Sequence, residues 1–224
     1  MLEDDDLIVG TKSVIRPVWR WVFLGLFIGA LLGGVGGFTL FAAHIATAPP
    51  PTAQLDRADG IVVLTGRQGE IERSFELLID DRASRLLLSG VGVCITKEGI
   101  RHIVGGDATD AAVERFNCCV DVNREAHDIP GHINATGLWI ADKGYVRVII
   151  VAAAHHMPRT IMQFRAALPA TEITPYPVAS GAVPAHEWWL HPRTTLILAT
   201  EFAKTLGTWL NIQQRIILGS ALGD

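Results

Sequence analysis

Two adjacent histidines, a proline and an arginine form the most chemically suggestive group of residues in the sequence. His155, His156 and Arg159 directly follow Val146 to Val151, an apolar run rich in β-branched residues. Such a run is typical of a buried parallel strand, and open α/β sheets bind ligands at the carboxyl ends of their strands. An imidazole there can exchange protons near neutral pH, and a guanidinium can bind a phosphate or carboxylate. We predict His156 as a catalytic residue and His155 and Arg159 as ligand-binding residues.

These three residues also have structural interpretations. A half-buried His156 would cap the following helix, and Arg159 would form a salt bridge with an acidic residue on the surface. His155 is the weaker candidate of the two histidines, because neighbouring side chains usually point in different directions.

Two earlier apolar runs end in a hydroxyl residue followed by a glycine. Such pairs offer a hydroxyl group and a closely approachable backbone, which suit phosphate oxygens. Glycine is also common at the end of a strand where no ligand binds. The ligand-binding residues predicted at these turns are Thr65, Gly66, Arg67, Ser89 and Gly90.

A third polar group lies between residues 125 and 132. Glu125 and Asp128 are predicted as catalytic carboxylates, and His132 as a ligand-binding residue. Together with His156 they could suit a divalent metal, but no His-x-x-x-His spacing supports a metal site and we predict none. Ser89 lies in Leu-Ser-Gly-Val rather than in a Gly-x-Ser-x-Gly elbow, and no Gly-x-Gly-x-x-Gly follows the first strand. The cofactor stays unidentified.

Strands and helices alternate along the chain with short connections, which predicts a parallel α/β sheet covered by helices on both faces. The polar turns would then meet at one edge and form a cationic pocket. The predicted strands are Ile61–Leu64, Arg85–Leu88, Cys118–Val122, Val146–Val151 and Ile173–Val178. The predicted helices are Ile71–Ile79, Thr96–Phe116 with a break at Gly105-Gly106, Asn134–Lys143 capped by Gly144, Met157–Leu168 and Thr194–Leu218.

A single apolar segment precedes this domain. Trp21 to Ala43 contains 23 residues without a charge, which is roughly 34 Å of helix and enough to span a bilayer. A signal peptide cleaved near Ala46-Thr47-Ala48 is the alternative. Lys12, Arg16 and Arg20 precede the segment, so the positive-inside rule places the N-terminus in the cytoplasm and the domain outside it. The predicted division is a cytoplasmic tail (1–17), a transmembrane helix (18–46), a Pro-rich linker (47–56), an α/β domain (57–190) and a C-terminal helix (191–224).

Composition and spacing bear on partners. Apolar residues make up 49% of the chain, the net charge is −4 and no basic stripe occurs, so we expect no nucleic acid partner. Glycines recur every four residues in the apolar segment, which favours a homodimer, although glycine is also common in transmembrane helices. These glycines are Gly25, Gly29, Gly33 and Gly37.

Two further features of the sequence stay open. The C-terminal helix either packs on the domain or lies in a membrane interface, helped by Trp188, Trp189 and Trp209. Cys94 would pair with Cys118 or Cys119 in an oxidising compartment, because a ring between the two neighbouring cysteines would be strained, or all three are buried free thiols.

Several blocks resemble the YdcF-like family of envelope proteins (domain of unknown function 218) over roughly residues 57 to 210. The blocks are residues 58–66, 85–91, 124–128 and 145–165, with His156-Met157-Pro158-Arg159 the most specific part, and Glu201-Phe202-Ala203-Lys204 in the tail helix.

The resemblance implies a Rossmann-like three-layer α/β/α domain, often behind one membrane helix, and a role in envelope or peptidoglycan homeostasis. With the orientation of the anchor it places the domain in the periplasm, on a bacterial inner membrane. The residues of the predicted pocket indicate an anionic small molecule or lipid-linked precursor as the partner. This chain differs from the family pattern at Arg67, Glu70, the segment 128–133 and Ala152-Ala153. A hydrolase or transferase and a non-catalytic scaffold protein with a degenerate site are therefore both open.

Overall fold

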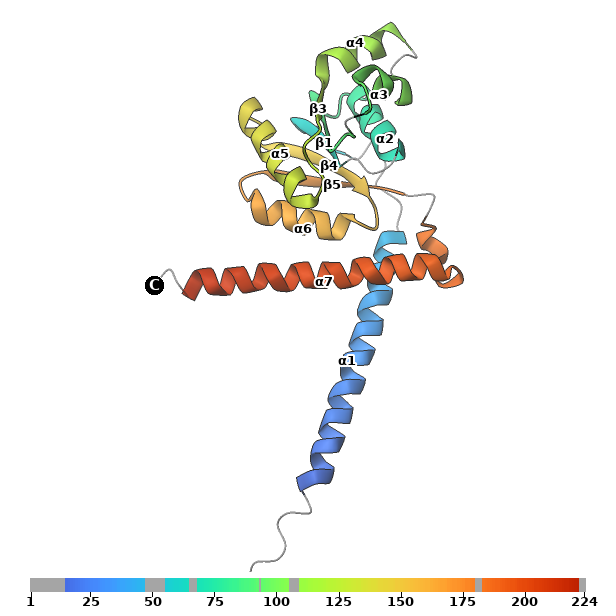
Figure 1. Ribbon diagram of the computed structural model, residues 1–224, viewed down its shortest axis with the longest axis vertical. Helices are drawn as coiled ribbons and strands as arrows, with labels where there is room; N and C mark the ends of the chain where they lie inside the picture. Colours follow the sequence, from blue (N-terminus) through green and yellow to red (C-terminus); the bar gives the residue numbers. More distant parts are fainter. Residues whose placement is uncertain are drawn as a thin grey trace, which may run out of the picture. The chain divides into compact units, whose positions relative to one another are not determined.

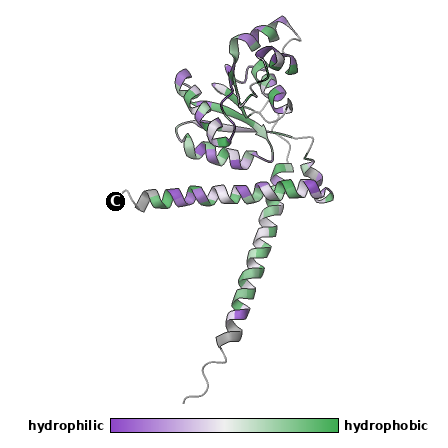
Figure 2. Ribbon diagram, viewed as in Figure 1, coloured by the Kyte–Doolittle hydropathy of each residue, from purple (hydrophilic) through white to green (hydrophobic). Residues whose placement is uncertain are grey.

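The computed structural model describes residues 15–46, 55–64, 68–92, 94–104, 109–179 and 183–221. The chain folds as two compact units, residues 1–44 and residues 45–224. Helix α1 (Ile15–Ala46) contains a stretch, Trp19–Ala46, that is long and apolar enough to span a membrane. Figure 2 shows apolar residues along most of its length. An added Cβ at Gly25, Gly29 or Gly33 would meet nothing within 4 Å, and the homodimer stays a prediction.

The second unit contains one parallel sheet, which confirms the predicted α/β class and the Rossmann-like layering. Five strands lie in the order β3-β2-β1-β4-β5, and every neighbouring pair is parallel. Figure 1 shows helices on both sides of this sheet. The strands are β1 (Gly60–Leu64), β2 (Arg85–Ser89), β3 (Val120–Asn123), β4 (Arg147–Ala153) and β5 (Glu172–Val178).

The helices of this unit form the outer layers and the C-terminal segment. In chain order they are α2 (Gln68–Ile79), α3 (Lys97–Ile103), α4 (Asp110–Cys119), α5 (Ile129–Lys143), α6 (Met157–Ala167), the 3-10 helix η2 (Ala185–Leu190) and α7 (Pro192–Ala221).

Alternating residues of the strands supply two separate hydrophobic cores. Ile61 and Val63 of β1 pack in the core shared with α2, α3 and α4. Val62 and Leu64 pack in the core shared with α5 and α6. Successive strand residues point to opposite faces, so a strand buried on both sides must be apolar throughout. The strand order reverses between β1 and β4, and a crevice outside the carboxyl ends of two such strands is the usual ligand site of this architecture.

Several predicted boundaries differ from the structure by two residues or more, and two of them affect the disulfide and the site. The third strand begins at Val120 rather than Cys118, because both cysteines still belong to α4. Helix α5 begins at Ile129 rather than Asn134, because the Asp128 side chain caps it by accepting a hydrogen bond from the Gly131 N–H at 2.8 Å. Gly144 ends α5 with φ 67°, as predicted for a left-handed C-cap.

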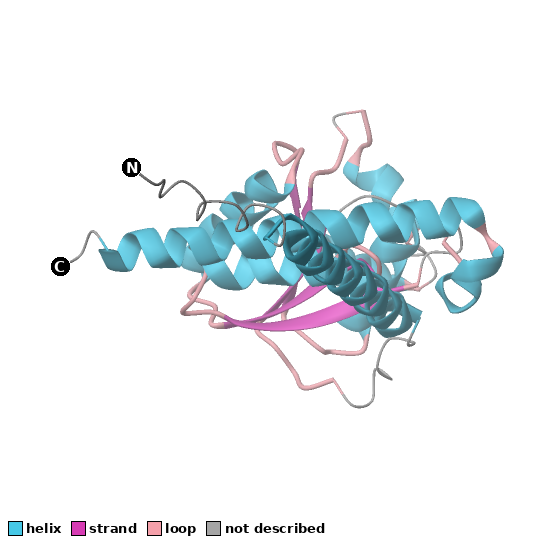
Figure 3. Cartoon of the chain, turned by 90° about the horizontal axis from the view of Figure 1, so that it is seen from below, coloured by secondary structure: helices cyan, strands magenta, loops and turns pink. Residues whose placement is uncertain are grey.

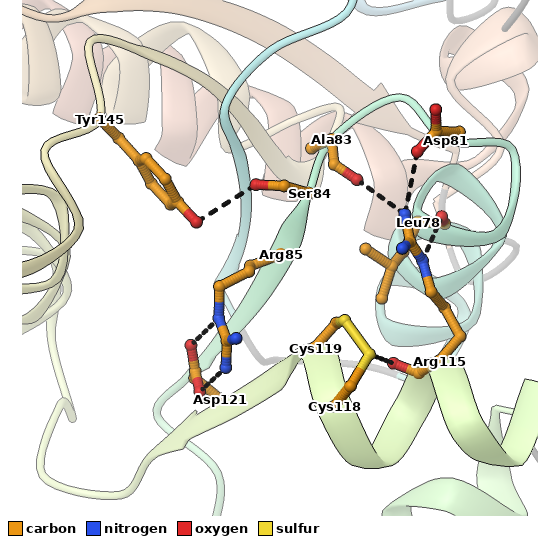
Figure 4. The surroundings of a disulfide bond; sticks show 10 residues. All are labelled: Leu78, Asp81, Ala83, Ser84, Arg85, Arg115, Cys118, Cys119, Asp121 and Tyr145. Atoms are coloured by element: carbon orange, nitrogen blue, oxygen red, sulfur yellow. Dashed lines mark hydrogen bonds and ion pairs between the residues drawn. A yellow bond between two sulfur atoms is a disulfide. The ribbon is translucent and has the colours of Figure 1, made fainter.

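The cysteine pairing also differs from the prediction. Cys118 and Cys119 form a disulfide in the last turn of α4, and Cys94 is free and exposed (Figure 4). Both alternatives given for the cysteines were therefore wrong, because Cys94 pairs with neither Cys118 nor Cys119 and the three residues are not buried free thiols. The bond lies close to the amino end of the sheet.

The amino end of the sheet carries charged side chains in fixed pairs. Arg85 donates two hydrogen bonds to Asp121, at 2.9 and 2.7 Å, as Figure 4 shows. The Trp139 indole N–H donates to the same carboxylate at 2.9 Å. Asp59 accepts hydrogen bonds from the backbone N–H groups of residues 146 and 147, at 2.9 and 2.8 Å. A Cβ on Gly60 would lie 2.5 Å from the Trp139 ring, so only glycine fits beneath that indole.

Helix α7 packs against α6 and η2. Gln163 of α6 donates a hydrogen bond to Thr208 of α7 at 3.3 Å, and Leu198 of α7 is fully buried. Figure 3 shows this long helix running across the unit and past it toward the C-terminus. The prediction that the C-terminal helix packs on the domain is therefore confirmed for part of its length.

Candidate functional site

A pocket of about 330 Å³ lies where β1 and β4 end, between the amino ends of α5 and α6. This is the crevice where the strand order reverses. The lining residues come from both strands and from α2, α5 and α6. They are Leu64, Glu70, Asp128, Ile129, His132, Ala152, Ala153, His155, His156, Arg159 and Thr160.

His156 lies at the boundary between β4 and α6. It is the N-cap residue of α6, and its own side chain forms no cap hydrogen bond. The Met157 N–H donates to the Ala154 carbonyl oxygen at 3.3 Å, and Pro158 has no N–H. Its side chain is 44% exposed, and its Nδ1 atom lies 3.2 Å from Oε2 of Glu201 on α7. The imidazole is thus positioned from one side by a carboxylate while it borders the pocket.

Glu201 is buried, with its side chain 4% exposed, and it contacts three basic groups. Besides His156 these are Arg159, whose Nε lies 3.3 Å away, and Lys204, whose Nζ lies 2.7 Å away. Burial alone would raise the pKa of Glu201, but its contacts with His156 and Lys204 and the charge of Arg159 lower that pKa to about 2. Glu201 is therefore a carboxylate at every pH at which the protein would work.

Arg159 thus forms the salt bridge that we gave as its structural alternative. Its side chain is 20% exposed, and it lines the pocket while its Nε contacts Glu201. A guanidinium has five N–H donors, so one contact does not exhaust its capacity to bind an anion. The predicted ligand-binding role of Arg159 stays a prediction.

His155 is buried beside His156. Its ring centroid lies 4.0 Å from that of His156, and both rings border the pocket. The expectation that the two side chains diverge was therefore wrong, because a turn at residues 154–156 replaces the extended backbone on which it depended.

Ser89 and His132 form a buried pair next to the pocket. The Ser89 Oγ lies 2.7 Å from the His132 Nδ1, and Ser89 has no exposed surface. Burial lowers the pKa of His132, which the nearby charge of Asp128 only partly offsets. His132 is thus a neutral imidazole at neutral pH. Ser89 supports it from behind and does not line the pocket.

The described lining is of mixed charge rather than cationic as expected. Glu70 is buried, and Asp128 caps α5, so two carboxylates face one arginine. Carboxylates accept hydrogen bonds from hydroxyl groups. The guanidinium of Arg159, by contrast, attracts negative charge. The two sides of the pocket therefore suit different parts of a ligand.

Other predicted site residues lie farther away or outside the described chain. Gly90 adopts φ 85° after β2, and its N–H donates to Asn123. Glu125 is exposed and does not line the pocket. The predicted residues Thr65, Gly66 and Arg67 lie outside the described residues.

Sequence reasoning missed three residues of the site, namely Glu70, Thr160 and Glu201. The signal for Glu201 is its position in the buried stripe of α7, three residues after Leu198 and seven after Thr194. An acidic residue in a helix's packing stripe is almost never buried without a partner. That rule would have indicated a basic residue facing Glu201.

The described residues contain no group of three His, Cys, Asp or Glu side chains arranged to hold a metal ion. A second hollow, of about 650 Å³, is lined by α4 alone and includes Asp110, Glu114 and Cys118. Because a single helix forms it, this hollow is an open surface feature rather than a site built from several elements.

Comparisons with protein-family models, with curated proteins and with solved structures find no match to this chain. The geometry of the pocket therefore carries the functional argument, and the YdcF-like resemblance stays a prediction.

Proposed function

We propose that this chain is a membrane-anchored envelope protein whose pocket binds a small phosphate-bearing or nucleotide-like metabolite, which it hydrolyses or transfers. One observation carries the proposal. His156, whose Nδ1 lies 3.2 Å from the Glu201 carboxylate, borders a pocket together with Arg159 at the start of α6. An imidazole and a guanidinium together suit proton transfer next to a bound anion.

The two sides of the pocket fit such a ligand. The anionic group would lie at the α6 side, near the guanidinium of Arg159. Hydroxyl groups would face Glu70 and Asp128, whose carboxylates accept hydrogen bonds. A volume of about 330 Å³ is at the small end of ligand pockets, so it suits a sugar phosphate or mononucleotide better than a dinucleotide.

His156 is the proposed general acid or base. The Nδ1 atom is buried and lies 3.2 Å from a Glu201 carboxylate oxygen without an aligned hydrogen bond, so Nε2 is the ring nitrogen that we propose to exchange the proton. The same carboxylate stabilises the imidazolium formed when Nε2 takes a proton. Glu201 is thus a positioning residue that acts through His156.

The proposed location is a bacterial inner membrane, with α1 as a single-pass anchor and the second unit in the periplasm. The length and apolar character of α1 support the anchor. The basic residues before it support the orientation. The resemblance to envelope proteins supports a role in envelope or peptidoglycan homeostasis.

A non-catalytic binding or scaffold function is the second candidate. Ala152 and Ala153 line the pocket at the end of β4, where the family that this chain resembles carries hydroxyl residues. A pocket without those hydroxyls can still hold a ligand but has fewer groups for stabilising a transition state.

Binding and turnover measurements on the purified full chain in detergent micelles distinguish the enzyme from the scaffold protein. We would measure thermal stabilisation by nucleotides, S-adenosylmethionine and lipid-carrier phosphates. For the phosphate-bearing compounds that bind, we would also measure phosphate release. His156→Gln is the test variant, and His191→Gln, in the exposed segment before α7, is the matched control.

Turnover that falls at least about tenfold in His156→Gln but not in His191→Gln supports the enzyme, since a general acid or base contributes about 10²-fold or more. Binding without phosphate release supports the scaffold. Stabilisation by none of these compounds contradicts the proposed ligand class.

A further inference from the structure

The second half of α7 exposes large apolar side chains that no part of the second unit covers. Helix α7 has 30 residues, about 45 Å at roughly 1.5 Å per residue, whereas α6 beneath it has only 11. Figures 1 and 3 both show the C-terminal end of α7 running past the α/β body. The exposed apolar residues, 46% to 63% accessible, are Leu206, Trp209, Leu210, Ile216, Ile217 and Leu218.

Several of these residues lie opposite the face that packs on the domain. Successive helix residues are roughly 100° apart, so Leu206, Leu210 and Ile217 lie about 140° to 180° around the helix from the buried Glu201. Helix α7 therefore has a packed stripe and a second apolar stripe on its far side. Near its end, Ile216 and Leu218 lie on either side of Ile217 and widen this second stripe.

We infer that this surface of α7 lies on the membrane that α1 is proposed to enter. The inference rests on the membrane anchor of the proposed function. Only eight residues, 47–54, separate the end of α1 from Leu55, and eight extended residues span at most roughly 29 Å. If α1 spans the membrane, Leu55 at the start of the described domain would therefore lie within roughly 30 Å of the end of that helix.

The charges of α7 favour an anionic lipid surface over a second copy of the chain. Between residues 192 and 221 the basic residues are Arg193, Lys204 and Arg215, and the single acidic residue is Glu201. Glu201 is buried and already contacts basic groups. Lys204 already pairs with Glu201. The α7 helix of a second copy would offer no acidic partner to Arg193 or Arg215, whereas anionic headgroups would neutralise them.

A fluorescent probe at neighbouring positions of α7 tests this inference in the full chain. The chain, with the exposed Cys94 replaced by serine, is reconstituted in vesicles of phosphatidylcholine and phosphatidylglycerol. An environment-sensitive fluorophore is attached to Leu210→Cys or to Asn211→Cys. Residue 211 is also exposed but lies on another side of the helix, so it is the matched control. A probe at Ile28→Cys reports on α1 separately.

We expect a lipid-chain quencher to act several-fold more strongly on the probe at 210 than on the probe at 211, and aqueous iodide to show the reverse. Equal access of iodide to both probes would overturn the inference. A probe at 210 shielded from both quenchers would also overturn it, in favour of pairing between copies. Loss of lipid quenching at 28 would overturn the anchor itself and the α7 inference with it, whereas quenching at 28 without quenching at 210 overturns the α7 inference alone.

Discussion

The two ends of the parallel sheet carry similar kinds of polar side chain but use them differently. At the amino end, Arg85 on β2 and Asp121 on β3 pair across neighbouring strands. At the carboxyl end, His156 and Arg159 pair with Glu201, which comes from a helix outside the sheet. A pocket of about 330 Å³ lies beside that second cluster.

Side chains at both ends stabilise the fold, but the proposed ligand pocket lies at the carboxyl end alone. The pairs at the amino end lie between elements that the sheet already holds, so they need no further part of the chain. The cluster at the carboxyl end depends on α7, and any movement of α7 would change the environment of His156. Substitutions at the two ends should therefore differ in whether they affect ligand binding.

The largest expected effect is at Glu201. Its pKa of about 2 lies well below the usual 4.5, which corresponds to about 3 kcal/mol of stability in favour of the buried carboxylate. Glu201→Gln should therefore lower the free energy of unfolding at pH 7 by up to about 3 kcal/mol and also weaken ligand binding. Because the folded pKa is depressed, the difference from the unsubstituted chain should shrink as the pH falls from 4.5 toward 2.

Denaturant unfolding of the full chain in micelles measures this difference. Glu172→Gln, at an exposed position of β5, is the control and should change the stability little. Equal losses in the two variants would show that the contacts of Glu201 with basic groups do not stabilise α7 on the domain.

Replacing Asp121 at the amino end should lower the free energy of unfolding somewhat less than replacing Glu201, and it should leave ligand binding unchanged. Burial raises the pKa of Asp121, but hydrogen bonds from Arg85 and Trp139 outweigh it and leave that pKa below its usual value. Asp121→Ala removes all of these bonds, which should cost about 2 kcal/mol because the pair is partly solvated. Asp142→Ala, which breaks the exposed pair with Lys143, should cost less than about 1 kcal/mol.

Ligand stabilisation of the same Asp121→Ala variant tests whether ligand binding depends on the amino end of the sheet. The gain in melting temperature on adding ligand should match that of the unsubstituted chain, because Asp121 lies at the opposite end of the sheet from the pocket. A variant that loses ligand stabilisation as well would contradict the separation of the two ends.

The sheet was predictable from local pattern, and the site only in part. Apolar runs such as Ile61–Leu64 indicate strands buried on both faces, and short connections indicate parallel neighbours, so strand content and the carboxyl-end location followed. The start of α5 was missed although Asp128 and Pro130 form a standard helix-start signal. The signal was instead interpreted as a variant of a family motif.

Tertiary packing accounts for the rest of the site. The Glu201 carboxylate lies 42 residues from Arg159 in the chain, and no local spacing connects them. The contact exists because α7 crosses α6 at that point. Likewise the Ser89–His132 pair joins residues 43 apart, across a strand end and a helix. Long-range contacts of this kind leave only weak traces in a single sequence.

The smallest expected effect concerns acid sensitivity, and it also differs between the two ends. Burial lowers the pKa of His132, so below about pH 6.5 the unfolded chain binds a proton that the folded chain resists. Stability should therefore begin to fall as the pH drops below about 6.5. At the amino end, by contrast, hydrogen bonds from the backbone and from Arg85 lower the pKa values of Asp59 and Asp121, so their contribution should persist until the pH falls below about 4.

Melting temperatures between pH 7.5 and 5.5 test this ordering. The decrease over that range should be shallower in His132→Gln than in the unsubstituted chain, because glutamine does not titrate. His127→Gln is the matched control, because His127 is exposed and close in sequence to His132. If the two variants show the same pH dependence as the unsubstituted chain, another group causes the acid sensitivity and the carboxyl end is no more sensitive to acid than the amino end.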